Sequence, residues 1–358
     1  MLGMARRKDP PAPPPTLASV AAVLGVSRTT VSNAYNRPDQ LSVELRERIL
    51  AAAKEIGYSG PNPTARSLRT SRAGAVGVIL TEALSYAFED QASVAFLAGL
   101  SKQTRYSLTL IPAAGHEGDN DLVTSAIVDG FVVYSVPGGD PHLAAARARG
   151  LPLVVCDQPT GLHDVPFVGI DDFHAIQPTA RALVEAGHRR IGILTKRLFS
   201  APHNGFVPES RVPGSDMHVQ RARVKGALEI FHAAGIAEVP IVNRHLNDLA
   251  SAADGARELI GAHPELTAVL CTTDSMALGV FDAYGSRVPA DLSVTGFDGI
   301  AAARHLGLTT VDQPNTRKGS EVGAMLSSLI DATAPAPRII LDTEFIPGRT
   351  VVAPARGR

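Results

Sequence analysis

One stretch decides how the N-terminal part of this chain folds: Gly25-Val-Ser-Arg-Thr-Thr-Val-Ser-Asn-Ala-Tyr-Asn36, which lies within the segment Thr16–Leu68. Before it, apolar residues recur at helical spacing and predict a helix with one buried face: Leu17, Val20, Ala21 and Leu24. Gly25 can adopt the positive φ that ends such a helix. Ser27 is a suitable N-cap for the next one. The stretch therefore predicts two short helices joined by a tight turn.

The second helix has two different faces. Val31, Ala34 and Tyr35 would point inward, whereas Arg28, Thr29, Ser32 and Asn33 would lie on the outer face. A third helix is expected after the N-cap Ser42, with a buried stripe of Leu45, Ile49, Ala52 and Ile56. Two helices around a glycine turn, with polar residues near the start of the second, indicate a helix-turn-helix. The alternative interpretation of the polar residues is an ordinary solvated helix face.

The charge of the chain is distributed unevenly. The net charge is −1, but residues 1–72 carry 11 Lys and Arg against 5 Asp and Glu. The rest of the chain then holds 23 basic and 30 acidic residues. A basic head on an acidic body indicates that only the head meets a polyanion such as DNA.

Several classes of protein are disfavoured. The two cysteines, Cys156 and Cys271, lie in apolar runs and show no metal or disulfide spacing, so we expect buried thiols and no metal or cofactor. Proline-rich sequence stands where a signal peptide needs an apolar run, and no apolar stretch is long enough to span a membrane, so we expect a cytoplasmic location. His116-Glu117 begins a zinc-hydrolase motif, but Asn120 replaces its second histidine. We therefore expect no catalytic residues and no enzyme.

From Ala75 onward, short apolar runs alternate with segments of helical length. Strands are expected at residues 75–80, 108–111, 131–134, 153–156, 191–194, 239–242, 268–271, 293–297 and 309–311. Helices are expected between them, for example at 140–149, 175–186, 221–234 and 249–261. This alternation predicts an α/β fold with parallel sheets covered on both faces. Nine strands favour two doubly wound subdomains, with a ligand site in the cleft between them.

The chain from Thr16 resembles the lactose/galactose repressor (LacI/GalR) family of bacterial transcription regulators. The residues that carry this resemblance in the head are Thr16-Leu17, Val20-Ala21, Gly25-Val26-Ser27, Thr30-Val31-Ser32, Asn36, Ser42, Arg46, Ile56-Gly57-Tyr58, Pro61-Asn62, Ala65-Arg66 and Leu68. Those in the body are Asp129-Gly130, Asp157, Gly169-Ile170-Asp171-Asp172, residues 187–192, Arg223, Gly226, Thr273-Asp274, Met276-Ala277, Gly279, Gly296-Phe297-Asp298, residues 309–311 and Gln313-Pro314. The resemblance implies a homodimer, a hinge helix and a periplasmic-binding-protein-like core that senses a small molecule.

The sequence pattern and this resemblance together predict the following domains, in chain order. Residues 1–15 form a disordered tail, 16–61 the helix-turn-helix domain, and 62–73 the hinge helix and linker. Residues 74–358 form the effector-binding and dimerisation core. Its N-subdomain takes about 74–170 plus 314–342, and its C-subdomain about 171–313 plus 343–358. The stretch from Lys196 to Met217 is interpreted as an insertion. It would form either a lid over the cleft or a surface loop.

The resemblance assigns DNA-binding roles to fourteen residues. Arg28 would contact guanine, Asn33 adenine, and Thr29 a thymine methyl group or another base edge. The family positions that contact the phosphate backbone of DNA are matched by Ser27, Thr30, Ser32 and Asn36. Thr16 and Leu17 are the remaining residues of the head that are expected to contact DNA. Leu68 would wedge into the minor groove, supported by Tyr58, Asn62, Ala65 and Arg66. The alternative for Leu68 is a side chain that covers the body.

The resemblance also implies an effector site. The matching polar residues are Asp157, Arg223, Thr273 and Asp298, whose chemistry suits polyhydroxylated ligands. Phe88 and Asp90, near the end of the first strand, are added as candidates for the same site. Capping, salt bridging and core packing are the structural alternatives for these side chains. Thr273 and Gly299 depart from the family pattern, in which Asn and a second Asp are common.

The expected function is a sequence-specific DNA-binding regulator, a repressor whose affinity for a pseudo-palindromic double-stranded operator is controlled by a sugar or related metabolite. Two alternatives remain open at this point. One is a DNA-binding regulator with no effector response, and the other is a solute-binding protein that shares the two-lobed core.

Overall fold

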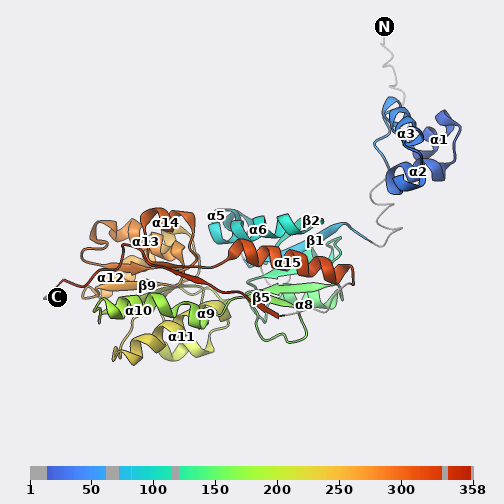
Figure 1. Ribbon diagram of the computed structural model, residues 1–358. Coiled ribbons are helices and arrows are strands. Elements are labelled where there is room, and N and C mark those ends of the chain that lie inside the picture. Colours follow the sequence, from blue (N-terminus) through green and yellow to red (C-terminus); the bar gives the residue numbers. More distant parts are fainter. Residues whose placement is uncertain (1–13, 62–71, 82, 114–120, 333–337, 356–358) are drawn as a thin grey trace, which may run out of the picture. The chain divides into compact units, whose positions relative to one another are not determined.

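The computed structural model describes residues 14–61, 72–81, 83–113, 121–332 and 338–355. The chain divides into two compact units, residues 1–73 and 74–358, which we call the head and the core. Figure 1 shows a helical head and an α/β core. The fold class expected from the sequence is therefore confirmed. Residues 62–71 of the expected hinge helix and linker (62–73), and residues 1–13 of the expected tail (1–15), lie outside the described residues.

Each helix of the head begins at a polar cap. Helices α1 (Leu17–Leu24), α2 (Arg28–Asn36) and α3 (Val43–Glu55) follow Thr16, Ser27 and Ser42, whose side chains accept a backbone N–H three residues ahead. A 3₁₀ turn, η1 (Pro38–Gln40), precedes α3. Gly25 ends α1 at φ 63°. The head buries a small apolar cluster: Val20, Ala21, Val31, Ala34, Ile49 and Ala53.

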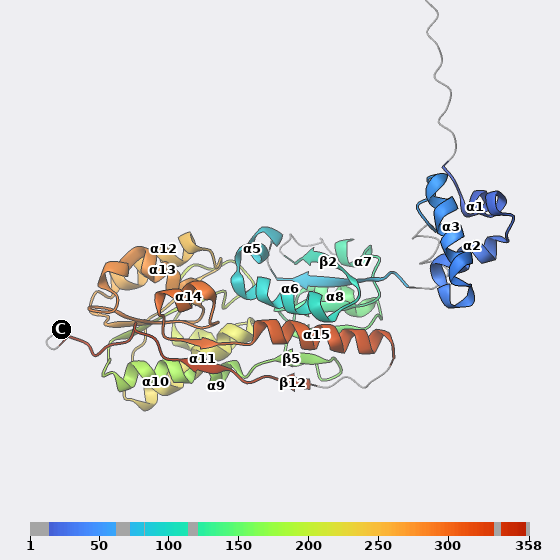
Figure 2. The ribbon, with the colours of Figure 1, turned by 45° about the horizontal axis from the view of Figure 1, so that its top comes forward.

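The first lobe of the core contains a fully parallel six-stranded sheet. Its strands are β1 (Ala75–Leu80), β2 (Ser107–Pro112), β3 (Phe131–Tyr134), β4 (Leu153–Cys156), β5 (Phe167–Gly169) and β12 (Arg338–Ile340), in the order β12-β5-β4-β3-β1-β2. The associated helices are α5 (Leu84–Glu89), α6 (Gln91–Gln103), α7 (Asp121–Thr124), α8 (Pro141–Ala148) and α15 (Asn315–Ile330). Figure 2 shows α6 and α15 side by side. Gly99 and Gly319 permit this packing, since a Cβ at either would collide with backbone of the other helix.

The second lobe repeats the plan with five strands. They are β6 (Ile191–Lys196), β7 (Gly205–Phe206), β8 (Ile241–Arg244), β9 (Ala268–Cys271) and β10 (Ser293–Thr295), in the order β10-β9-β6-β8-β7, and only β7 is antiparallel. The helical segments are α9 (Asp172–Ala175), α10 (Gln177–Glu185), η2 (Glu209–Gly214), α11 (His218–Ala233), α12 (Leu249–Ala262), α13 (Asp274–Tyr284), η3 (Gly285–Arg287) and α14 (Ala301–Leu306).

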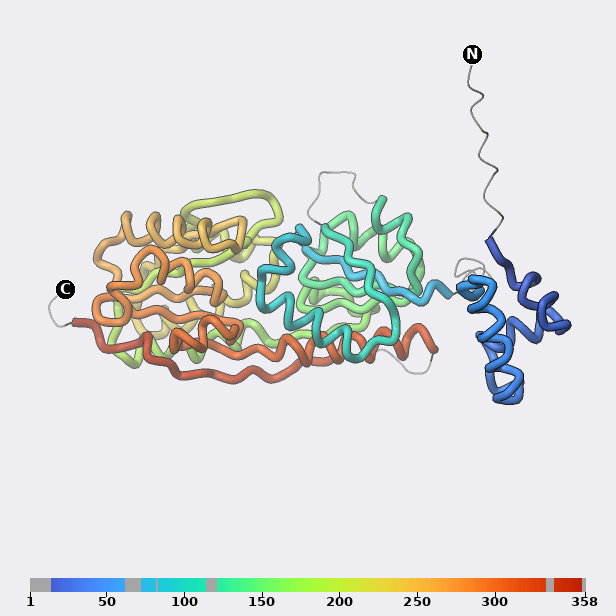
Figure 3. Tube along the Cα trace, turned by 90° about the horizontal axis from the view of Figure 1, so that it is seen from above, coloured from blue at the N-terminus to red at the C-terminus, as the bar shows by residue number. Residues whose placement is uncertain are grey.

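Three short segments connect the lobes. The first crossover runs from β5 to α9, and the second runs from β11 (Thr310–Asp312) to α15. The third leads from β12 to β13 (Glu344–Ile346), which pairs antiparallel with β11. Figure 3 shows this last segment running along both lobes toward the C-terminus. The crossovers place the carboxyl ends of the strands of the two lobes opposite each other.

The observed strands differ from expectation in a few places. Strand β8 begins at Ile241 rather than at 239, because Pro240 has no N–H to donate to a neighbouring strand. Strand β10 ends at Thr295, two residues early, just before Gly296 and Phe297. The two- and three-residue strands β5, β7, β12 and β13 were not expected, because such segments are too short to show the alternation of apolar and polar residues that indicates a strand.

The insertion at residues 196–217 is packed against the second lobe. Its strand β7 pairs with β8, and Asn243 holds it on both sides by donating to the carbonyl of His203 and accepting from the amide of Leu198. Val207 and Val212 are buried. The segment is therefore built into the lobe, and its two ends reach the pocket described below.

Candidate functional site

The start of α2 presents an exposed polar surface. Ser27 Oγ accepts the amide of Thr30 at 3.0 Å, and the two side-chain hydroxyls lie 2.8 Å apart. Ser27, Arg28 and Thr29 are exposed, whereas Val31 is fully buried. The cap and the buried face thus fix the orientation in which Arg28 and Thr29 project from the head.

The later polar residues of α2 are half-buried and already have partners. The amide of Asn33 donates to Gln40 Oε1 at 3.2 Å. The amide of Asn36 donates to the carbonyl of Ser32 at 3.1 Å and to its hydroxyl at 3.2 Å. Base or phosphate contacts by these side chains would therefore compete with, or add to, contacts within the head.

The remaining predicted head residues have structural roles that can coexist with DNA contact. Thr16 forms a capping box with Ser19 at the exposed start of α1. Leu17 is half-buried against the apolar cluster of the head. Tyr58 packs edge-on against Tyr35, with ring centroids 6.0 Å apart. The other four predicted contacts, Asn62, Ala65, Arg66 and Leu68, lie outside the described residues.

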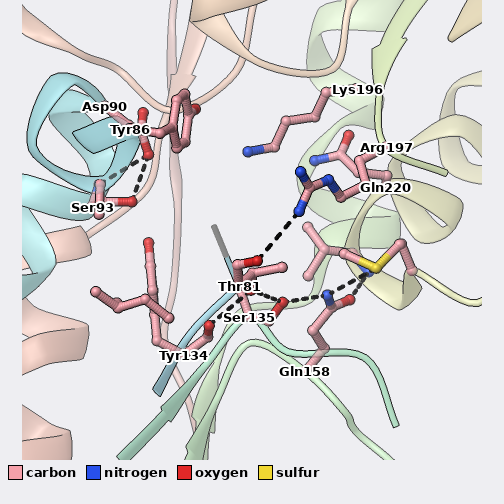
Figure 4. A pocket seen from close by; sticks show the side chains of 14 residues that line it. Thr81, Tyr86, Asp90, Ser93, Tyr134, Ser135, Gln158, Lys196, Arg197 and Gln220 are labelled. Atoms are coloured by element: carbon pink, nitrogen blue, oxygen red, sulfur yellow. Dashed lines mark hydrogen bonds between the residues drawn. The ribbon is translucent and has the colours of Figure 1, made fainter. Parts of the chain in front are cut away.

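A pocket lies between the two lobes of the core, at the carboxyl ends of strands from both sheets. It encloses about 560 Å³ of empty space, open solvent included. Figure 4 shows Tyr86, Asp90, Ser93 and Tyr134 on one side and Lys196, Arg197 and Gln220 on the other. The full lining is Leu80, Thr81, Tyr86, Ala87, Asp90, Ser93, Tyr134, Ser135, Gln158, Lys196, Arg197, Met217, Val219 and Gln220.

Hydrogen bonds between the lobes hold the floor of this pocket. Gln158 donates to the carbonyl of Ser135 at 2.7 Å and accepts the amide of Val219 at 3.1 Å. Arg197 Nε donates to the carbonyl of His245 at 3.1 Å, and its Nη1 lies 3.5 Å from the carbonyl of Thr81. The floor is therefore preorganised by residues of both lobes.

The walls offer charged groups and hydroxyls. The Asp90 carboxylate accepts the amide of Ser93 at 3.2 Å and its hydroxyl at 2.7 Å. Burial, aided by Asp157 and Asp90, raises the pKa of Tyr134 well above its usual range, so its hydroxyl stays a neutral donor. Lys196 Nζ lies 5.8 Å from the centre of the Tyr86 ring. Hydroxyls, amides and both signs of charge therefore surround the empty space.

The predicted effector residues are not brought together around this pocket. Asp90 lines it, whereas the side chain of Phe88 is exposed on α5 and lies outside the lining. Thr273 caps α13 and donates to Asn247 at 3.1 Å; Asn247 in turn donates to the hydroxyl of Tyr86 across the lobes. Thr273 is therefore linked to the lining residue Tyr86 through Asn247 and does not line the pocket itself.

Asp157, Arg223 and Asp298 lie in buried ionic contacts beside the pocket. Asp157 pairs with Lys318 at 2.8 Å, and Arg223 pairs with Asp172 at 2.8 Å and with Asp298 at 3.4 Å. Charges that are removed from water require such partners, which explains why Asp157 and Arg223 are held in ion pairs beside the pocket. Asp298 lines a second pocket, together with residues at the start of α6 and of α15. Arg223 therefore forms salt bridges in this structure, and its contact with an effector stays a prediction.

Two buried carboxyl groups of the second lobe have raised pKa values. Burial raises the pKa of Asp298 to about 7, although Arg223 acts in the opposite direction. Burial also raises the pKa of Asp274 to about 6, partly offset by the hydroxyl of Thr310 and backbone amides. Asp298 has φ 125°, a value that residues other than glycine rarely adopt, and such strain concentrates at functional sites.

Sequence reasoning missed most of the pocket lining, although some signals were available. Lys196 and Arg197 directly follow the strand expected at 191–194, where ligands bind in open α/β sheets. Gln158 follows Asp157, and Gln220 lies one helical turn before Arg223. Side chains next to the family-matched positions therefore form the pocket.

Within the described part of the chain, no group of three or more His, Cys, Asp or Glu side chains is placed to hold a metal ion. No described helix combines the length and apolar character needed to cross a membrane.

Comparison with protein families gives two matches. Residues 16–62 match the family of bacterial regulatory proteins of the lacI type, and residues 180–351 match a periplasmic binding protein-like domain. The HTH-type transcriptional regulator IpsA of Corynebacterium glutamicum is 52% identical and covers 94% of this chain and 97% of its own.

Solved structures agree with these matches. A crystal structure of a LacI-family transcriptional regulator from Corynebacterium glutamicum has a TM-score of 0.74 and 48% identity, covering 94% of this chain and 98% of its own. The structure of the transcriptional regulator CelR in complex with cellobiose has a TM-score of 0.66 and 27% identity, covering 94% and 99% of the two chains.

Proposed function

Because this chain belongs to the LacI family of bacterial transcriptional regulators, we propose that it is a repressor whose operator binding is controlled by a small molecule in the interlobe pocket. The protein acts in the cytoplasm as a homodimer. Two heads then contact two half-sites of a pseudo-palindromic operator, since the symmetry of the site mirrors that of the dimer.

The DNA half of the proposal is supported by the N-terminus of α2. Arg28 and Thr29 are exposed there and oriented by the Ser27 cap. Arg28 reads a guanine through two hydrogen bonds, and Thr29 contacts a neighbouring base edge. The positive balance of residues 1–72 adds attraction to phosphates, which weakens as salt rises.

The main support for control by a small molecule is the chemistry of the residues that line the pocket. Donors and acceptors from both lobes surround one space, among them Asp90, Tyr134, Lys196 and Gln220. Such a set suits a compact polyhydroxylated molecule, because each hydroxyl can donate to a carboxylate or amide oxygen and accept from an amine. The cellobiose complex of CelR supports a carbohydrate-like effector.

The switch follows from the position of the pocket between the lobes. A ligand that touches both lobes favours one arrangement of them, by no more than its difference in affinity for the two arrangements. The start of the core is tied to the first lobe, where the amide of Gly74 donates to Asp129 at 2.7 Å. A change of lobe arrangement therefore reaches the linker, where it changes the spacing of the two heads.

The alternatives are a regulator without an effector response and a solute-binding protein without DNA binding. Footprinting of the full-length protein on selected DNA, with a panel of sugars, polyols and nucleosides, distinguishes them. The proposal expects a two-fold footprint that at least one compound weakens or strengthens. A footprint that no compound changes would leave only the DNA half, and no footprint at low salt would contradict the DNA half.

A further inference from the structure

A fully buried lysine joins two parts of the core. Lys318, on α15, is 1% exposed. Its ammonium donates to both oxygens of Asp157, at 2.8 and 3.0 Å, and to Gln313 Oε1 at 2.8 Å. All three of its protons thus have an acceptor. Burial lowers the pKa of Lys318, but its neighbours, Asp157 foremost, raise it above the usual value overall, so the ammonium stays charged.

Gln313 continues the chain of contacts into the second lobe. Its Nε2 donates to Asp298 Oδ1, while its Oε1 accepts from Lys318. Only one orientation of the amide satisfies both partners. The position of the Asp298 carboxylate is therefore coupled through Gln313 and Lys318 to that of Asp157. Gln313 lies on the second crossover, directly after β11.

Arg223 extends the same chain to the first crossover. Its Nη1 lies 3.4 Å from Asp298 Oδ1 and 2.8 Å from the carbonyl of Thr272. Its Nε donates to Asp172 Oδ1 at 2.8 Å, and Asp172 begins α9 immediately after the first crossover. The guanidinium also stacks on Phe297, 3.7 Å from the ring centre.

The six side chains form one continuous path, which we call the relay: Asp157, Lys318, Gln313, Asp298, Arg223 and Asp172. None is more than 8% exposed. The relay begins at the end of β4 in the first lobe, passes the second crossover, and ends at the first crossover. A rotation of one lobe against the other changes the backbone at these crossovers, so it must stretch or rearrange the relay.

We infer that Lys318 and Gln313 are positioning residues that couple the two crossovers through this relay and thereby set the lobe arrangement on which operator affinity depends. The regulatory part of this inference rests on the proposed function. The coupling itself rests on the core alone. A purely local role would make Asp157–Lys318 and Asp172–Arg223 two independent ion pairs.

Gln313→Met separates these possibilities. The substitution keeps the length of the side chain and leaves both ion pairs intact, so the core is expected to fold. Lys318→Met removes the anchor itself, and Lys225→Met on the exposed side of α11 is the matched control. Hydrogen exchange is measured by mass spectrometry on the full-length protein without DNA or ligand.

The relay predicts a distant effect of Gln313→Met. Three amides at the start of α9 should exchange at least threefold faster than in the wild type: that of His174, which donates to Asp171 Oδ1, and those of Ala175 and Ile176, which donate to the carbonyls of Asp171 and Asp172. Lys225→Met should leave them unchanged. Faster exchange confined to residues near the substitution, at about 310–320, would overturn the coupling.

The regulatory part has its own measurement. Without any small molecule, Gln313→Met should change the affinity for a DNA sequence selected with the wild type by at least threefold. An unchanged affinity would overturn the regulatory role. Failure of the wild type to bind any DNA at low salt would instead contradict the proposed function, while the exchange result would still decide the coupling.

Discussion

The head and the core use polar side chains in opposite ways. In the head, polar residues such as Thr16, Ser27 and Ser42 cap helices within three residues of themselves, and all described carboxyl side chains are exposed. In the core, Asp157 meets Lys318 and Arg223 meets Asp172 across long stretches of sequence, in buried contacts. The head thus presents its polar groups to a partner, whereas the core uses many of its own to hold together segments that are far apart in the sequence.

Under the proposed function, this difference separates recognition of DNA from control by a small molecule. A surface that reads DNA gains from exposed groups on a rigid helix, because their hydrogen bonds are completed by the bases. A sensor needs two arrangements of similar free energy, which packed interfaces between lobes can provide. A buried polar network whose members are all satisfied holds one such arrangement firmly, so it can bias the choice between the two. Four substitutions test this difference between the head and the core.

The largest effect is expected from Lys318→Met in the core. It leaves the Asp157 carboxylate buried without a counter-ion, so the free energy of unfolding of the core should fall by about 3–5 kcal/mol. Adding Asp157→Asn removes the second charge and should restore most of this loss. Urea unfolding followed by circular dichroism measures both. A loss below about 1 kcal/mol would show that water solvates Asp157.

A slightly smaller effect is expected from Ile49→Ala in the head. Ile49 is fully buried in a cluster of only six buried residues, so the substitution should destabilise the head by about 3 kcal/mol. Operator binding should be lost, while the thermal unfolding midpoint of the core stays the same. A parallel fall of the core midpoint would show that the two units do not unfold independently.

Arg28→Ala tests recognition without changing stability. Because Arg28 is exposed, the fold should be unaffected. Discrimination at one base pair should fall by about 1–3 kcal/mol, measured by binding to operators with single substitutions. An equal loss of affinity on all sequences would instead identify Arg28 as a phosphate contact.

The smallest effect concerns pH. Asp298 has a pKa of about 7 in the folded core, above the usual value of 3.8. At pH values between these two, the folded state therefore binds more protons than the unfolded state. Its stabilising contribution is complete below about pH 4 and is lost as pH rises through 7. Asp298→Asn should therefore reduce the decline in core stability between pH 4 and 7, in denaturant titrations at several pH values. An unchanged slope would contradict the raised pKa of Asp298.

The sequence predicted the elements that local rules control. The caps at Ser27 and Ser42, the turn at Gly25 and most strands of the core follow from propensity and period. The number of strands indicated two subdomains, and the resemblance to a known family then implied a periplasmic-binding-protein-like core. Short strands such as β5 and β12 were missed because pairing with neighbours, rather than their own sequence, makes them strands.

The pocket was less predictable because long-range contacts assemble it. Family-matched residues such as Asp157 and Arg223 have charged partners, Lys318 and Asp172, that only the folded chain brings close. The residues that face the empty space, such as Lys196, are neighbours of predicted positions. Sequence therefore located the region of the site, and the structure was needed to separate pocket lining from the buried relay.

Comparison of Lys196→Met with Lys225→Met tests whether operator binding is controlled through the interlobe pocket. Lys196 lines the pocket, whereas Lys225 is exposed on α11. Operator affinity of each full-length variant is measured by fluorescence anisotropy, with and without the same panel of sugars, polyols and nucleosides. At least one compound is expected to change the affinity of the wild type and of Lys225→Met at least tenfold, whereas Lys196→Met is expected to lose this response while still binding DNA. An equal response of both variants would contradict control through this pocket.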